Sequence, residues 1–174
     1  MKERERESFR WVRGTGVTLT FAAALVFLVS FFLPTATQIG SMMGAPLAIQ
    51  SGWTTFVESL TLSAEVIGVP MFNFQPLAIL CYLSPIPNGL MLLAPLVNMK
   101  AKHYAAFFGA VLFFNATTAI WVCFEVYEGI SVGFYVWIGS ILMMALASFL
   151  ISGSYVMEDN LEHERLLAEW KGKL

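Results

Sequence analysis

The feature that most constrains this chain is its middle, because residues 14–99 contain neither lysine nor arginine and are mostly apolar. The whole chain is 57% hydrophobic and 13% charged, whereas ordinary soluble domains are about 45–50% apolar and about 25% charged. The core of a water-soluble domain does not accommodate so long an apolar run. We therefore interpret residues 14–99 as two membrane spans joined by an outer loop.

Apolar stretches of the length that crosses a bilayer, about 20 residues, occur four times. They cover residues 14–33, 73–97, 104–124 and 131–155, and a polar tail of residues 156–174 follows. We expect an all-α integral membrane protein with a single domain, a four-transmembrane-helix bundle. In the first span Gly16, Thr20 and Ala24 recur at four-residue spacing. This spacing either lets a neighbouring helix approach closely or arises by chance in an apolar helix.

The distribution of the basic residues predicts the orientation. Of the ten lysines and arginines, five precede the first span, two lie between the second and third spans, and three are in the tail. Cytoplasmic loops of membrane proteins carry the excess of lysine and arginine, so we expect both termini to be cytoplasmic. The expected location is the cytoplasmic (inner) membrane of a bacterium, where the chain would be a multi-pass protein.

Within the long outer loop, residues 52–67 have the pattern of an amphipathic helix, with Trp53, Phe56 and Leu60 on one face. The segment lacks lysine and arginine, so it is poorly suited to bind anionic lipid by charge. We expect it to cover the outer ends of the spans or to bind a partner. Further candidate partner contacts cluster on one side of the tail: Leu166, Leu167 and Trp170.

The second span is interrupted near its middle by residues 84–89, which include Pro85 and Pro87. These prolines remove two backbone donors and disturb the preceding turn, so we expect a kink or a local unwinding. In hydrocarbon such a break is tolerated only where protein or a wet cavity covers it. The candidate polar or structural site therefore consists of Ser84, Pro85, Pro87, Asn88, Asn115 and Thr118.

Two interpretations of this break remain open. In the first, Asn115 and Thr118 of the third span donate to the carbonyls of Cys81 and Leu83, which the prolines leave without donors. In the second, the break lines a path for a ligand or an ion, as interrupted helices do in transporters. The structural interpretation is favoured, because polar links between spans are worth only about 0.6–2 kcal/mol and are often structural.

Chemistry-bearing residues are scarce in the expected spans, which contain no Asp, Glu, Lys, Arg or His. This disfavours a proton relay. Both histidines, His103 and His163, lie on the cytoplasmic side, where neither serves as an axial haem ligand within the membrane. Together with Cys81 and Cys123 they form no zinc spacing. We expect no catalytic residue, no cofactor, no metal site and no nucleic-acid partner.

The function expected from these observations is a non-catalytic accessory or scaffold subunit of a larger membrane protein complex. Its expected partners are membrane lipids and other membrane subunits, or further copies of the chain. The alternative is a small oligomeric channel or transporter with a polar path at the broken second span. A lipid-modifying enzyme acting through Glu125 and Glu128 is disfavoured, because no nucleophile or metal ligand accompanies them.

Overall fold

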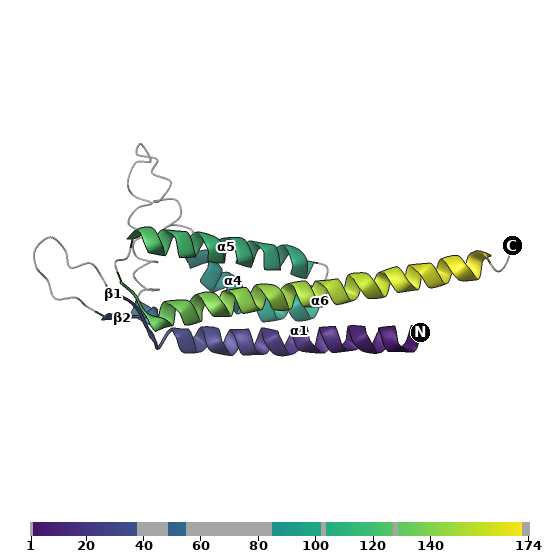
Figure 1. Cartoon of the computed structure of the whole chain (residues 1–174), viewed down its shortest axis with the longest axis horizontal. Coiled ribbons are helices and arrows are strands. Elements are labelled where there is room, and N and C mark those ends of the chain that lie inside the picture. The colour runs from purple at the N-terminus through teal and green to yellow at the C-terminus, as the bar shows by residue number, and fades with distance from the viewer. Residues whose placement is uncertain (1, 38–48, 55–84, 102–103, 127–128, 172–174) are drawn as a thin grey trace, which may run out of the picture.

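The computed structural model describes residues 2–37, 49–54, 85–101, 104–126 and 129–171. Its long helices are α1 (Lys2–Ser30), α4 (Pro85–Lys100), α5 (Ala105–Val126) and α6 (Val132–Lys171). Figure 1 shows them running side by side, with the N- and C-terminal ends of the chain at the same end of the bundle. The expected helical architecture is confirmed, and two helices are long and apolar enough to cross a membrane: Glu7–Ser30 of α1, and α6.

Helix α6 makes the most extensive contacts in the bundle, with α1 and α5, and it also contacts α4. Gly16 of α1 permits one close approach: a Cβ at this position would lie 2.7 Å from Ile151 Cγ1 and 3.3 Å from the Ala147 carbonyl oxygen. Gly109 of α5 permits another, since its Cβ would lie 3.0 Å from the Ala145 carbonyl oxygen. Small residues at such positions allow helix backbones to approach closely.

The four-residue spacing of small residues on α1, which the sequence left open, therefore corresponds to a close helix contact at Gly16. Gly16 and Thr20 are buried, and Ala24 packs partly buried against the core. The core between the helices is apolar, and its largest fully buried side chains include Phe27, Met91, Leu112, Ile141 and Met144. These small residues thus lie beside an apolar core to which all four long helices contribute.

Helix α4 begins at Pro85. The first helical position suits proline, because its missing N–H would have no partner within the helix there. Residues 85–89 of the segment where a break was predicted are helical, and residues 73–84 of the expected second span lie outside the described residues, so the break itself stays a prediction. The expected end of the second span at residue 97 was too early, because α4 continues through Asn98 to Lys100.

Helix α6 is a single helix of 40 residues, about 60 Å long at 1.5 Å per residue. The last expected span and the described part of the polar tail are thus one continuous helix, which passes through Asp159 and Asn160. Its last 17 residues, 155–171, contain neither Gly nor Pro and include many good helix formers. An ion pair between Arg165 and Glu169, one turn apart at 3.0 Å, adds to it.

A small antiparallel sheet, not anticipated from the sequence, lies where α1 ends and α6 begins. Strand β1 (Pro34–Thr37) pairs with β2 (Ile49–Ser51) on one side and with β3 (Gly129–Ile130) on the other. A Cβ at Gly133 would lie 2.5 Å from the Pro34 carbonyl oxygen, so glycine there lets the start of α6 pack against β1. In Figure 1 the sheet lies at the opposite end of the bundle from the termini.

Candidate functional site

The most developed polar arrangement inside the bundle is centred on Asn98 of α4, whose surface is only 3% exposed. Its side-chain nitrogen donates a hydrogen bond of 3.0 Å to Thr20 Oγ1 on α1 and lies 3.8 Å from Met144 Sδ on α6. Its side-chain oxygen accepts a hydrogen bond of 2.9 Å from Ser148 Oγ, also on α6. We call Thr20, Asn98, Met144 and Ser148 the Asn98 cluster.

The hydrogen-bonding groups of the Asn98 cluster are all used within the bundle. The hydroxyl of Thr20 donates to the Gly16 carbonyl oxygen at 2.9 Å while it accepts from Asn98. The hydroxyl of Ser148 also lies 3.0 Å from the Met144 carbonyl oxygen, so its one proton serves either of two acceptors. A satisfied network of this kind in an apolar interior specifies one arrangement of its helices. The cluster contains no acid or base, so its chemistry is hydrogen bonding.

A second polar link joins α4 to α6 nearer to the sheet end of the bundle. Asn88, 7% exposed, accepts a hydrogen bond of 2.8 Å from Trp137 Nε1. The indole in turn packs against the ring of Phe134, with 5.9 Å between ring centroids. Asn88 was a predicted site residue, and the structure places it inside the bundle with its side-chain oxygen bonded to Trp137. Ser84 and the side chains of Pro85 and Pro87 lie outside the described part of the chain.

The other predicted site residues, Asn115 and Thr118, bond within their own helix. Asn115 Nδ2 donates to the Val111 carbonyl oxygen at 2.8 Å, and Thr118 Oγ1 donates to the Phe114 carbonyl oxygen at 2.9 Å. Their expected partners, the carbonyls of Cys81 and Leu83, are not among the described residues. Over residues 88–101 and 104–120, no hydrogen bond joins Asn115 or Thr118 to Asn88.

Sequence reasoning missed Asn98, although a signal for it exists. Asn88, Met91, Ala94 and Asn98 follow one another at spacings of three, three and four residues, and all four are buried. This is the spacing of one helix face. Extending the second span by one turn would have placed Asn98 on that buried face.

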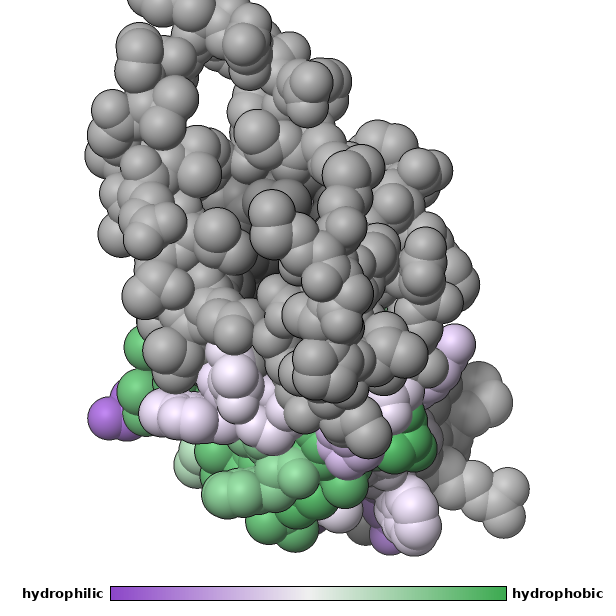
Figure 2. Space-filling model, turned by 90° about the vertical axis from the view of Figure 1, so that its left-hand side faces the viewer, coloured by the Kyte–Doolittle hydropathy of each residue, from purple (hydrophilic) through white to green (hydrophobic). Residues whose placement is uncertain are grey.

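The outer surface of the bundle is strongly apolar. Large exposed side chains occur on every long helix, among them Leu25, Leu92, Leu96, Phe107 and Phe114. Figure 2, which looks onto the sheet end, shows apolar residues in green over much of the described surface. An apolar surface of this extent marks contact with a membrane or with another protein.

The predicted partner contacts are exposed wherever the structure describes them. Trp170 is 70% exposed on the last turns of α6, and Leu166 and Leu167 are exposed beside it. Trp53 is also exposed, and its ring makes an edge contact with Phe31 at 6.1 Å between centroids. The remaining two, Phe56 and Leu60, lie outside the described residues.

An ion pair marks the level at which α6 leaves the bundle. Arg13 of α1 donates to the carboxylate of Glu158 on α6. Its guanidinium carbon also lies 4.1 Å from the centre of the Tyr155 ring, a cation–π distance. Beyond this level the described residues of α6 are almost all exposed. Residues 156–171 are called the α6 arm below.

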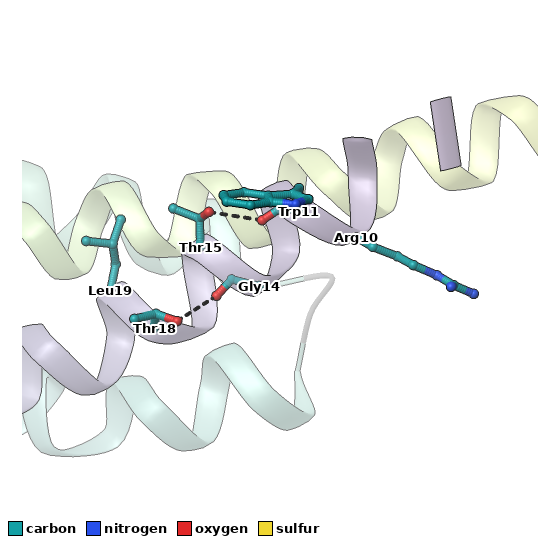
Figure 3. Close-up of a pocket in the computed structure, with 6 residues that line it drawn as sticks. All are labelled: Arg10, Trp11, Gly14, Thr15, Thr18 and Leu19. Atoms are coloured by element: carbon teal, nitrogen blue, oxygen red, sulfur yellow. Dashed lines mark hydrogen bonds between the residues drawn. The ribbon is translucent and has the colours of Figure 1, made fainter. Parts of the chain in front are cut away.

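A groove follows the exposed side of α1 close to this level (Figure 3). It is shallow and wide open to the surroundings, with a volume of about 530 Å³. We call it the α1 groove, and it is lined by Arg10, Trp11, Gly14, Thr15, Thr18 and Leu19.

Comparison with known proteins gives no family for this chain. No family model matches it, and neither a curated protein nor a solved structure shows significant similarity to it. Within the described residues, no group of three His, Cys, Asp or Glu side chains is arranged to hold a metal ion.

Proposed function

We propose that this chain is a non-catalytic accessory or scaffold subunit of a larger membrane protein assembly. In this proposal it crosses the membrane as a four-helix bundle with both termini in the cytoplasm. The orientation rests on the distribution of the basic residues, which are all outside the four expected spans. The fold agrees with it in one respect, since both ends of the chain lie at the same end of the bundle (Figure 1).

The membrane part of the proposal is supported by the inverted polarity of the bundle. The amides of Asn88 and Asn98 face inward and bond to α1 and α6, while large apolar side chains face outward. In a bilayer, polar groups need internal partners and apolar side chains contact lipid without cost. The two polar links bond to other side chains of the bundle, so no specific observation favours the channel or transporter alternative.

The observation that carries the scaffold role is the α6 arm. It continues helix α6 beyond the Arg13–Glu158 ion pair, and it presents Leu166, Leu167 and Trp170 to the surroundings. Tryptophan is enriched among the anchor residues of protein interfaces, and exposed apolar side chains grouped beside it mark a contact surface. The arm thus offers a binding surface for a cytoplasmic or membrane-bound partner. Because the arm is part of α6, this surface is covalently continuous with the bundle.

The test is purification of the chain in native-lipid particles, followed by identification of the co-purifying proteins. A triple variant, Leu166→Ala/Leu167→Ala/Trp170→Ala, removes the apolar anchors of the α6 arm. The matched control, Glu164→Ala/Arg165→Ala, changes the same arm without changing its net charge. We expect wild type and control to co-purify with the same larger assembly and the triple variant to lose it. A lone protein of 19.3 kDa, with no reproducible partner and no self-association, would contradict the proposal.

A further inference from the structure

The α1 groove has a simple origin in the sequence. Two rows of side chains at four-residue spacing follow the exposed side of α1, and the second position of one row is Gly14, between Arg10 and Thr18 (Figure 3). A Cβ added at Gly14 would meet no atom within 4 Å. The missing side chain therefore leaves open space on the helix surface.

The two ends of the α1 groove differ in chemistry. Arg10 and Trp11 lie at the end nearer the N-terminus, and Leu19 lies at the other end. Between them, Thr15 Oγ1 donates to the Trp11 carbonyl oxygen and Thr18 Oγ1 donates to the Gly14 carbonyl oxygen, both at 3.0 Å. The threonine hydroxyls are thus satisfied by the backbone. A charged end therefore leads to an uncharged one over nine residues, about 13 Å along the helix.

We propose that the α1 groove binds one anionic glycerophospholipid of the cytoplasmic leaflet. Its phosphate lies at Arg10, and the upper part of an acyl chain lies over Gly14 towards Leu19. The inference rests on the proposed membrane embedding and goes beyond the proposed scaffold role. Tryptophan and arginine at the membrane–water interface, followed by apolar depth, match the order of polarity within a lipid molecule.

Charge selects an anionic lipid. The neighbouring Arg13 is engaged with Glu158, whereas Arg10 makes no ion pair with any side chain that the structure describes. Its charge is therefore available to a phosphate. Anionic lipids are attracted to basic residues at the cytoplasmic surface by about 1 kcal/mol per residue.

The shape of the α1 groove favours an acyl chain over a partner helix. Trp11 is 78% exposed beside Gly14, so the space left by the glycine is bounded by a large side chain that stands out from α1. A second helix approaches closely only where small residues leave its path clear, and here Trp11 stands in that path. A flexible acyl chain fills a gap of one side chain's width.

The experiment reconstitutes the full chain into phosphatidylcholine nanodiscs that contain about one tenth phosphatidylglycerol as the anionic probe. Detergent-released protein is then analysed by native mass spectrometry for retained lipid. Gly14→Leu fills the α1 groove, and Arg10→Gln removes its charge. The matched controls are Gly139→Leu, at another glycine with open space around its Cβ position, and Lys171→Gln, at an exposed residue of the α6 arm.

We expect wild type and both controls to retain one phosphatidylglycerol molecule in preference to phosphatidylcholine. Retention should fall about fivefold in Arg10→Gln, the factor equivalent to about 1 kcal/mol, and should be lost in Gly14→Leu. Equal retention in Gly14→Leu and wild type would overturn the lipid site. A change of oligomeric state in Gly14→Leu without a change in bound lipid would overturn it in favour of a protein contact.

Alkaline carbonate extraction of the host membranes distinguishes a failure of the lipid site from a failure of the proposed membrane embedding. Wild type that stays in the membrane but retains no phosphatidylglycerol contradicts only the lipid site. Wild type that is released by carbonate contradicts the membrane embedding, and the lipid site with it.

Discussion

At the scale of single residues, Asn98 holds the most consequential contacts. Its amide bonds to Thr20 and Ser148, which belong to different helices. Hydrogen bonds between helices of membrane bundles stabilise the folded state by about 0.6–2 kcal/mol each, so the two bonds of Asn98 contribute modestly to stability. Its larger effect is on specificity, because a register shift of α1 or α6 would leave a buried amide unpaired.

We expect Asn98→Leu to lower the free energy of unfolding by about 1–2 kcal/mol, because the variant keeps the side-chain volume roughly constant while it removes both interhelical bonds. Reversible unfolding in mixed micelles, followed by circular dichroism, measures the change.

The control is Asn115→Leu, since the described hydrogen bond of Asn115 stays within α5. Its effect should remain within about 0.5 kcal/mol, as for substitutions that break no buried network. Equal losses in the two variants would show that the Asn98 cluster does not hold the helices together.

At the scale of elements, the contact between α1 and α6 organises the bundle. The close approach at Gly16 places the α1 backbone near Ile151 and Ala147, and one turn further along α1 the same face brings Thr20 to Asn98. The close approach of α1 to α6 at Gly16 and the hydrogen bond between Thr20 and Asn98 thus lie on the same face of α1.

Gly16→Leu should destabilise the bundle by about 1–3 kcal/mol, the usual cost of forcing extra atoms into a packed interface. Even the Cβ would lie 2.7 Å from Ile151 Cγ1, so α1 must move away from α6. Gly139→Leu is the control on α6, because open space surrounds its Cβ position. This variant should be neutral or gain up to about 1 kcal/mol from helix propensity.

Thermal unfolding in one detergent compares the two glycine variants. A Gly16→Leu protein as stable as Gly139→Leu would mean that α1 and α6 are not closely packed.

At the scale of the whole molecule, the distribution of charge and the direction of the helices agree. The termini lie at one end of the bundle and the small sheet lies at the other (Figure 1). Of the basic residues in the described part of the chain, Lys100 ends α4 and the others lie on the first half of α1 or on the α6 arm, which is the charge distribution on which the proposed orientation rests.

Reporter fusions test this orientation. Alkaline phosphatase fused after residue 101 or after residue 174 should be inactive, because the enzyme folds only outside the cytoplasm. The same reporter fused after residue 130 should be active. Fluorescent-protein fusions at the same sites should give the opposite pattern. Active phosphatase at residue 174 would contradict cytoplasmic termini.

Several features could be predicted from the sequence because their causes are local. Long apolar segments predicted the helices α1 and α6. The spacing of Gly16 and Thr20 was compatible with a close helix contact, which the structure shows at Gly16. Each of these signals depends on residues within one or two turns of one another.

The tertiary structure alone decided which polar residues matter. Asn98 lies 78 residues from Thr20 and 50 from Ser148 along the chain, and no local pattern reports a partner at that distance. The same holds for the pairing of β1 with β3 and for the open space at Gly14. The sequence by itself determined the helices and their charge order, because hydropathy and helix propensity act locally. The packing of α1, α4 and α6 determined the Asn98 cluster, since a hydrogen bond between helices exists only once they are in contact.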